Sequence, residues 1–162
     1  MPIIHLTTII KAPVQRVFNL SRSIDLHQMS MAHTNERAIA GKTNGLIEQG
    51  EWVTWEATHI GKKRYLTVAI TYMQPYSLFI DEMQKGDFKM VKHEHHFKQT
   101  GVATIMKDVF HFESPYGWLG NLVNALFLTR YMKRLLVQRN NIIKEYAETE
   151  RWKSVLPTPS HT

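Results

Sequence analysis

The sequence predicts a single α+β domain in which an antiparallel sheet is followed by one long C-terminal helix. Between residues 51 and 113, apolar and polar residues alternate in runs broken by short turns, which is typical of antiparallel hairpins. From Trp118 to about Trp152 the apolar residues instead recur every three or four positions, as in a helix. With 162 residues the chain can bury a core, so we expect one domain over residues 1–152 and a flexible tail over residues 153–162.

The composition is that of an ordinary globular protein. The chain has no cysteine, which excludes disulfides and thiolate metal sites and fits a reducing compartment. The N-terminus has no basic segment of the kind that opens a signal peptide, and the longest apolar run, residues 119–128, is too short to span a bilayer. We therefore expect a soluble, cytoplasmic protein without a transmembrane segment.

The net charge of +6 and the pI near 9.6 are compatible with binding to nucleic acid or to an anionic membrane. The basic residues are dispersed, however, over residues 62–64, the strands and the last helix. No helix-turn-helix or zinc-finger spacing accompanies them. We therefore expect a solvated basic surface and no nucleic-acid partner.

The first 50 residues predict a strand, two short helices and a second strand. Residues 3–11 alternate as a half-buried strand does. Pro13 suits the first position of a helix, and Ser23 suits the N-cap of another. Residues 36–40 fit a short strand, with a turn at residues 41–45. The side chains expected to face the core are Ile4, Leu6, Thr8, Ile10, Val14, Val17, Phe18, Ser21, Ile24 and Met29.

Three hairpins follow, and the length of each turn decides which residues face each other. We expect a four-residue turn at residues 60–63, a three-residue turn at residues 85–87 and a four-residue turn at residues 99–102. A further turn at residues 74–77 joins the first two hairpins. The resulting pairs are Val53–Ile70, Trp55–Val68, Ala57–Leu66, Phe79–His93, Asp81–Val91, His93–Asp108, Glu94–Lys107, His95–Met106 and Phe97–Thr104.

In these registers polar residues lie among large apolar ones on the inner face of the sheet. His93 is opposite Asp108 and diagonal to Asp81, with His95 one step along. A neighbouring carboxylate favours the charged imidazolium, and burial opposes it. Such a group could transfer protons as a general acid or base, or could contact the polar end of a ligand. It could also be a structural network, because buried polar atoms nearly always find partners.

The histidines also raise the question of a metal site. His93 and His95 share one face and, with Asp108, could supply three ligands, but His96 points to the other face. Two histidines at this spacing on a strand are weak evidence for a metal, and ordinary hydrogen-bonded histidines are far more common. We therefore expect no metal.

Arg139 lies on the apolar stripe of the long helix and so faces the sheet. It could bind a ligand carboxylate, pair with Asp81 or Asp108, or extend along the cavity wall to its rim. This stripe consists of Leu128, Met132, Leu135, Ile142 and Tyr146. The apolar residues that recur at three and four positions along the whole helix also include Leu122, Leu126, Leu136 and Ile143.

The order of elements and several local patterns resemble the SRPBCC superfamily, and a bacterial uncharacterised subgroup in particular. The superfamily includes START lipid-transfer domains, polyketide cyclase/dehydrase-like proteins and the birch-pollen-allergen fold. The resemblance covers about residues 2–150. Its patterns are IKAPVQRVFNL at 10–20, FIDEM…GDF at 79–88, HEHHF at 93–97, T…KD…F…P.G at 104–117 and RNN at 139–141.

This resemblance implies a START-like helix-grip domain, in which a curved antiparallel sheet wraps around the C-terminal helix. An elongated pocket for an apolar or amphipathic ligand then lies between sheet and helix. The residues expected to line it are Trp55, Val68, Phe79, Asp81, His93, His95, Phe97, Met106, Asp108, Phe110, Leu122, Leu126, Met132 and Arg139.

Three functions follow from these observations, because a fold alone says little about chemistry. We expect binding of a small hydrophobic or amphipathic molecule, such as a lipid or a polyketide-like compound. The alternative is a cyclase, dehydratase or isomerase that uses His93 with Asp108 or Asp81 for proton transfer. An interaction or stress-response module, suggested only by the basic charge and Trp52, is the third. Nucleophile-elbow, phosphate-loop, zinc-protease and dinucleotide motifs are absent from the sequence, so we expect no cofactor.

Overall fold

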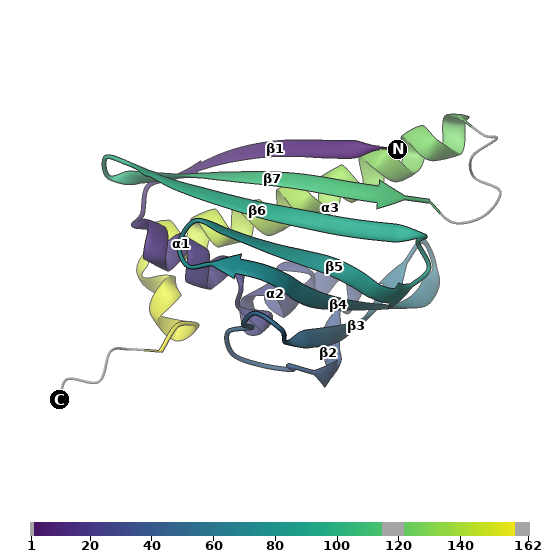
Figure 1. Ribbon diagram of the computed structural model, residues 1–162, viewed down its shortest axis with the longest axis horizontal. Helices are drawn as coiled ribbons and strands as arrows, with labels where there is room; N and C mark the ends of the chain where they lie inside the picture. Colours follow the sequence, from purple (N-terminus) through teal and green to yellow (C-terminus); the bar gives the residue numbers. More distant parts are fainter. Residues whose placement is uncertain (1, 115–121, 158–162) are drawn as a thin grey trace.

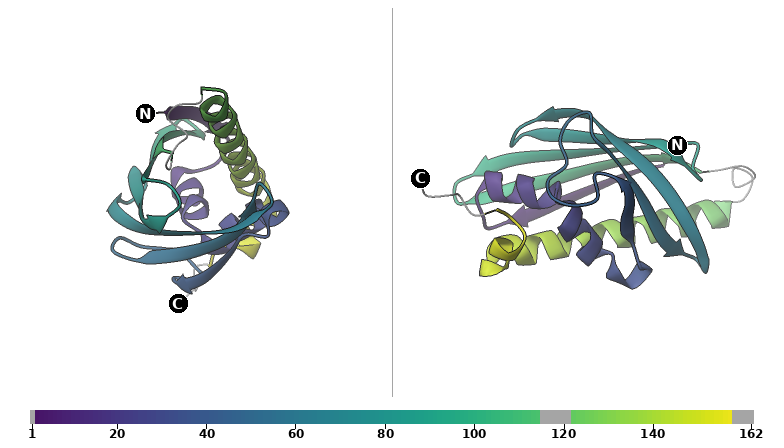
Figure 2. Two further views of the ribbon diagram at one scale, coloured as in Figure 1. Left: turned by 90° about the vertical axis from the view of Figure 1, so that its right-hand side faces the viewer. Right: turned by 90° about the horizontal axis from the view of Figure 1, so that it is seen from below.

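A computed structural model shows seven antiparallel strands in one curved sheet that wraps around a long helix (Figures 1 and 2). The structure describes residues 2–114 and 122–157, without the side chains of residues 122–124. The sheet order is β1-β7-β6-β5-β4-β3-β2. The elements are β1 (Ile3–Ile10), α1 (Val14–Ser21), α2 (Ile24–Ser30), the 3-10 helix η1 (Ala32–Thr34), β2 (Arg37–Gly41), β3 (Trp52–His59), β4 (Lys62–Gln74), β5 (Leu78–Gly86), β6 (Met90–Thr100), β7 (Ala103–Glu113), α3 (Leu122–Glu148) and the 3-10 helix η3 (Glu150–Ser154).

The predicted α+β helix-grip architecture is confirmed, and local chemistry explains its first elements. The hydroxyl of Ser23 accepts from the backbone N–H of Leu26 at 3.1 Å, which makes Ser23 the expected N-cap of α2. Pro13 is the N-cap of α1 and not its first helical residue. Met29 is 45% exposed, so the expectation that it faces the core was wrong. Leu26, at 1% exposure, takes that place.

The strand faces are as predicted, but each of the three predicted registers is displaced by two residues. Trp55 pairs with Leu66, and His95 pairs with both Phe79 and Asp108. Because side chains alternate with a period of two, this displacement changes the partners and leaves the faces unchanged. The observed replacements for the predicted pairs are Val53–Val68, Ala57–Arg64, Asp81–His93, His93–Phe110, Glu94–Val109 and Phe97–Met106.

For the β3–β4 and β6–β7 hairpins the displacement originates in the turns. Ile60 and Gly61 both have positive φ angles, 52° and 71°, and close β3 and β4 with a two-residue turn in place of the four-residue turn expected. Gly101, with a φ of 60°, likewise opens a two-residue turn between β6 and β7. The expected Glu94–Lys107 pair is therefore lost, and the Glu94 carboxylate instead contacts His96 and His111.

Helix α3 has 27 described residues, which corresponds to about 40 Å. The expected start at Trp118 lies outside the described residues. The helix ends before Thr149, whose extended backbone (φ −121°, ψ 179°) interrupts it. Beyond η3, Leu156 is only 9% exposed and packs on the core, three residues past the expected start of the tail. Within residues 2–114 and 122–157, no helix is long and apolar enough to cross a membrane.

The apolar core has two parts, and this division positions the site. One part, next to α1, includes Phe18, Phe97 and Ile143. The other, toward the opposite end of the sheet, includes Phe112 and Leu136. Polar residues separate them on each element that contributes to both.

Candidate functional site

A belt of polar side chains crosses the inner face of the molecule between the two apolar clusters. On β6, His93 and His95 follow Val91 of one cluster and precede Phe97 of the other. On the other elements too, the polar residues lie between a residue of one apolar cluster and a residue of the other. The belt consists of Thr8 on β1, Asp81 on β5, His93 and His95 on β6, Asp108 on β7, and Arg139 and Asn140 on α3.

On the sheet side the belt contains two histidine–carboxylate pairs. Nε2 of His93 lies 2.8 Å from Oδ1 of Asp108, and Nε2 of His95 lies 2.7 Å from Oδ2 of Asp81. Both contacts are diagonal in the sheet, because the residues opposite His93 are Phe110 and Asp81. The predicted contact between His93 and Asp108 therefore exists in a different register, whereas the carboxylate of Asp81 bonds to His95.

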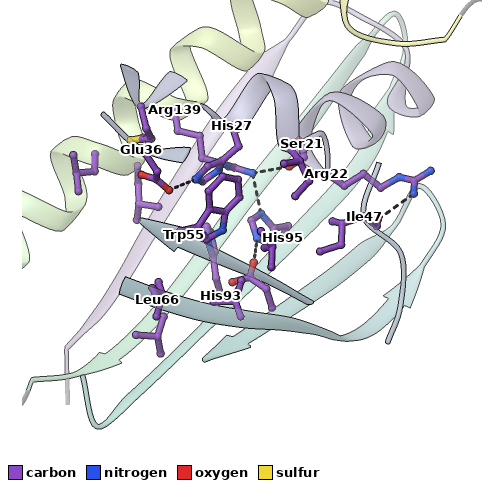
Figure 3. Close-up of a pocket in the computed structure, with 18 of the residues that line it drawn as sticks. Ser21, Arg22, His27, Glu36, Ile47, Trp55, Leu66, His93, His95 and Arg139 are labelled. Carbon is purple, nitrogen blue, oxygen red and sulfur yellow. Dashed lines mark hydrogen bonds and ion pairs between the residues drawn. The ribbon is translucent and has the colours of Figure 1, made fainter. Parts of the chain in front are cut away.

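Arg139 lies at the centre of the belt and is 5% exposed, so it is not at the rim. One terminal nitrogen donates to the carbonyl of Ser21 at 3.1 Å and lies 3.4 Å from Nδ1 of His95 (Figure 3). The other donates to Oδ1 of Asn140 at 3.0 Å and lies 3.7 Å from Oδ1 of Asp108. The guanidinium thus joins α1, β6, β7 and α3, with both terminal nitrogens engaged.

These contacts fix the protonation of His95. A guanidinium has no acceptor, so the His95 Nδ1 that faces Arg139 must itself accept. The proton is then on Nε2, which donates to Asp81. Burial lowers the pKa of His95 well below its ordinary value, and the charges of His93 and Arg139 act in the same direction. His95 is therefore neutral.

The two carboxylates differ in their titration. Burial by itself would raise the pKa of Asp108, but the hydrogen bond from His93 and the charges of His93 and Arg139 hold that pKa well below its usual range. Burial raises the pKa of Asp81, against the charges of His93 and Arg139. Asp108 is consequently a fixed anion, and Asp81 takes up a proton more readily.

The histidine rings also stack. The centroids of His93 and His95 are 3.7 Å apart, and those of His95 and Phe79 are 4.0 Å apart. Phe110 meets His93 edge-on at 5.1 Å. The stack holds the imidazole planes in place and leaves the ring edges, which carry the nitrogens, free to meet hydrogen-bond partners.

An inner cavity of about 190 Å³ lies over this belt (Figure 3). Nine of the residues expected to form a pocket line it: Trp55, Val68, Phe79, Asp81, His93, His95, Phe110, Met132 and Arg139. Phe97 and Met106 are instead buried in the apolar cluster around Phe18. Asp108 lies beneath His93 and bonds to it. Leu126 is 49% exposed, away from the cavity, and the side chain of Leu122 is not among those described.

The part of the cavity wall formed by α2 and the residues just before β2 contains a third histidine–carboxylate pair, which the sequence reasoning missed. Nε2 of His27 lies 2.7 Å from Oε1 of Glu36, and the His27 ring lies over Trp55 with centroids 4.3 Å apart. Both His27 and Glu36 line the inner cavity. His27 and Glu36 meet because the chain turns back between α2 and β2. The residues of that turn show the least regular pattern of apolar and polar residues in the sequence.

Asn140 was also missed, although the pattern RNN at residues 139–141 includes it. Its amide donates to Oδ2 of Asp108 at 2.7 Å and lies 3.4 Å from the hydroxyl of Thr8. Asn140 is 2% exposed, whereas its neighbour Asn141 is exposed. The helical period predicts which of the two faces inward, but not the carboxylate that it meets.

An outer cavity of about 220 Å³ adjoins the inner one, and both are lined by Glu36, Trp55, His59, Leu66, Met132 and Leu135. The Tyr131 hydroxyl lies 2.7 Å from Nδ1 of His59 and connects α3 to the tip of the β3–β4 hairpin. At the same end Arg64 pairs with Asp87 at 2.8 Å. Burial lowers the pKa of His59 and raises that of Tyr131. The two cavities thus adjoin under α3, and we refer to them together as the joined cavities.

Asp81, His93 and His95 could each offer one metal ligand atom, all within 4.8 Å of one another. Two histidines and a carboxylate are a known ligand set for divalent metals. Both nitrogens of His95 are already engaged, however, and one of them faces the Arg139 cation at 3.4 Å. The donor set therefore fits a hydrogen-bonded network better than a metal centre.

No protein-family model matches the sequence, and no curated protein matches it. Solved structures do match. The protein TTHA0849 from Thermus thermophilus has 18% identity and a TM-score of 0.68 over 88% of this chain and 97% of its own. Major latex-like protein 151 from Panax ginseng has 13% identity and a TM-score of 0.65 over 91% and 98%.

A third match is the di-domain ARO/CYC StfQ from the steffimycin biosynthetic pathway. It has 11% identity and a TM-score of 0.73 over 90% of this chain and 50% of its own. The major latex-like protein and the ARO/CYC are SRPBCC proteins, so the resemblance read from the sequence is confirmed at the level of the fold. At these identities the likeness establishes no activity.

Proposed function

We propose that the protein binds a small apolar or amphipathic molecule in the joined cavities. The observation that carries this proposal is a mainly apolar space interrupted by one polar belt. An apolar cavity of about 150 Å³ accommodates a benzene-sized ring. The cavities, at about 190 and 220 Å³, are each larger than that. Solved structures of similar fold include a major latex-like protein and an ARO/CYC.

The hydrogen-bonding state of the walls favours a ligand that donates. Arg139 was a candidate for binding a ligand carboxylate, but its terminal nitrogens are already committed to Ser21, His95 and Asn140. The other guanidinium at the cavity, Arg22, bonds to Asn19 and to the carbonyl of Ile47. The polar groups that remain include acceptors, namely the carboxylates of Asp81 and Glu36 and, in a neutral ring, Nδ1 of His93. A hydroxyl group therefore suits this site, whereas a carboxylate would be repelled.

Three probes with the same ring system, naphthalene, 2-naphthol and 2-naphthoate, test both the binding of an apolar molecule and the preference for a hydrogen-bond donor. Isothermal titration calorimetry should give measurable binding of the first two. The hydroxyl of 2-naphthol should add on the order of tenfold in affinity, and 2-naphthoate should bind weakest. Asp81→Asn should reduce the preference for the hydroxyl, and Glu82→Gln, on the same strand with its side chain on the opposite face, should not.

The experiment can reject the binding function and the preference for a hydrogen-bond donor independently of each other. If none of the probes binds and mass spectrometry of an organic extract finds no co-purified compound, the binding function is rejected. If 2-naphthoate binds best, binding stands and the preference for a donor is rejected.

A second candidate function is proton-transfer catalysis by His93, and one observation favours it. Nε2 of His93 faces the ionised Asp108, which Asn140 and Arg139 hold in place. His93 lines the cavity, and no hydrogen bond between described residues engages its Nδ1. When His93 is neutral and carries its proton on Nε2, Nδ1 could accept a proton from a bound molecule.

The test of this second function is a turnover assay on hydroxylated cyclic compounds. His93→Ala should lower the rate by roughly 10²–10⁴-fold, the usual share of general acid–base catalysis. His96→Ala, on the other face of the same strand, is the control. Equal activity of His93→Ala and the unmodified protein would reject the catalytic role.

A further inference from the structure

The outward face of α3 carries apolar and basic side chains together over its first half. Leu126, Phe127 and Val137 are 49%, 52% and 39% exposed. At 100° per residue they fall within about one third of the helix circumference, together with three exposed basic residues. We name this surface the α3 stripe; it consists of Leu126, Phe127, Arg130, Lys133, Arg134 and Val137.

The basic charge of the stripe is not balanced on its own helix. From Ser114 to Lys144 the sequence contains no aspartate or glutamate, and the first acidic residue of α3 is Glu145. Among the ion pairs between described residues, none includes Arg130, Lys133 or Arg134. These cations are therefore free to meet an external anion.

The helical segment that carries the stripe and the β3–β4 tip both line the outer cavity, and we place its mouth between them. Leu128, Met132 and Leu135 on the inward face of the same helical segment line that cavity. Tyr131 stacks on Phe127 of the stripe, with ring centroids 6.3 Å apart, and its hydroxyl meets His59 on the β3–β4 hairpin.

The other rim of the mouth has the same character. At the tip of the β3–β4 hairpin, Ile60 is 53% exposed and lines the outer cavity. Lys62 and Lys63 follow it and are exposed. Both rims of the cavity mouth thus present apolar side chains beside cations.

We propose that this end of the molecule docks on an anionic lipid surface. Apolar side chains gain free energy by entering the headgroup region, and neighbouring cations gain from anionic lipids, so the mixture suits an interface of this kind. A second copy of the chain would bring the same cations against one another. A nucleic acid would neutralise the cations but leave Leu126 and Phe127 in water.

Docking would place the cavity mouth against the lipid. A molecule that partitions into the membrane could then pass between bilayer and cavity without crossing bulk water. This role is separate from binding inside the cavity, because it depends on the stripe and the hairpin tip and not on the polar belt.

Vesicle co-sedimentation tests the proposal, with vesicles of phosphatidylcholine alone or mixed 3:1 with phosphatidylglycerol. The protein should bind the mixed vesicles and not the neutral ones. The triple variant Arg130→Gln, Lys133→Gln, Arg134→Gln should lose on the order of 100-fold in affinity. The matched control is the triple variant Lys85→Gln, Lys98→Gln, Lys107→Gln, which removes the same charge from exposed positions on the sheet.

Phe127→Ser separates docking from general charge attraction. It leaves the net charge intact and should still weaken binding to the mixed vesicles by several fold. Equal losses in both triple variants, or no binding of the unmodified protein, would overturn the proposal. So would a dimer in solution that Phe127→Ser dissociates, or binding to duplex DNA that the α3 triple variant abolishes while vesicle binding persists. Circular dichroism and thermal unfolding would verify that each variant is folded.

Discussion

The side-chain amide of Asn140 on α3 donates to Oδ2 of Asp108 on β7 at 2.7 Å. The other oxygen of the same carboxylate lies 2.8 Å from Nε2 of His93. Asp108 is only 1% exposed, so these groups replace the water that it would otherwise bind. The helix and the sheet are joined at this carboxylate.

Asn140→Ala should therefore destabilise the protein. Removing the amide leaves one oxygen of a buried anion without its donor, which costs about 1–3 kcal/mol, or more because the group is charged. Urea unfolding followed by circular dichroism would measure the loss. Asn141→Ala, one position along and exposed, is the control and should change the free energy of unfolding by less than about 0.5 kcal/mol. Similar losses in the two variants would contradict the role given to Asn140.

Arg139→Met should be more severe. Methionine fills much of the volume but leaves Asp108 and Asp81 without their cation, and breaking a buried ion pair typically costs about 3–5 kcal/mol. Arg139→Lys should recover only part of the loss, because one ammonium group cannot reach Ser21, His95 and Asn140 in the planar geometry of a guanidinium. Arg134→Met, on the exposed face, is the matched control. Full recovery by lysine would show that charge alone is needed.

Stability should fall as the pH drops below 6.5, the ordinary pKa of histidine. Because burial lowers the pKa of His95 in the folded state, the unfolded chain takes up a proton there that the folded chain does not. The free energy of unfolding should then decrease by up to about 1.4 kcal/mol per pH unit. Asp108, whose pKa is lowered by folding, adds a further loss below pH 3.8, and Asp81, whose pKa is raised, acts in the opposite sense.

Urea unfolding at pH 7.5, 6.5 and about 5.5 would measure this slope. His95→Gln should give a shallower slope, whatever its effect on stability at pH 7.5. His96→Gln, whose side chain is 42% exposed, should keep the slope of the unmodified protein. An unchanged slope in His95→Gln would mean that His95 does not carry the dependence.

Val68→Phe should obstruct the inner cavity. Val68 is 7% exposed and lines that cavity, so the added ring occupies space that a ligand would use. Calorimetric binding of 2-naphthol should fall at least tenfold, while the melting temperature changes little or rises as the cavity is filled. Val102→Phe, at an 87% exposed turn position, makes the same change away from any cavity. Undiminished binding to Val68→Phe would place the ligand elsewhere.

Periodicity was sufficient to predict the strands, their inner faces and the C-terminal helix, because burial imposes these patterns locally. It was not sufficient to predict strand partners. A two-residue turn and a four-residue turn give the same faces, and the shorter turn requires Ile60, a β-branched residue, at a φ of 52°. Such a conformation is unfavourable for isoleucine and is imposed by the surrounding hairpin. The residues of the turn alone therefore do not predict it.

For the candidate site, likewise, the sequence predicted which residues share a face but not which of them are in contact. Alternation along three strands brought Asp81, His93, His95 and Asp108 to one face, and the structure places them there. The strand register decides which histidine contacts which carboxylate. Because the register is displaced by two residues, Asp81 bonds to His95 and not to His93, its predicted neighbour. Asn140 and the His27–Glu36 pair depend on contacts between distant elements, for which the sequence gives no local pattern.

The walls of the joined cavities are held together more strongly at the inner end than at the outer end. At the inner end Arg139 anchors α1, β6 and α3 through a buried guanidinium, so separating these walls would expose an uncompensated charge. At the outer end the walls meet through His59 with Tyr131, which are half-buried, and Arg64 with Asp87, which are partly exposed. Breathing motions should therefore begin at the β3–β4 tip. Amide hydrogens there should exchange faster than those at the centre of β6, and exchange of a bound molecule should be limited by how often this end opens.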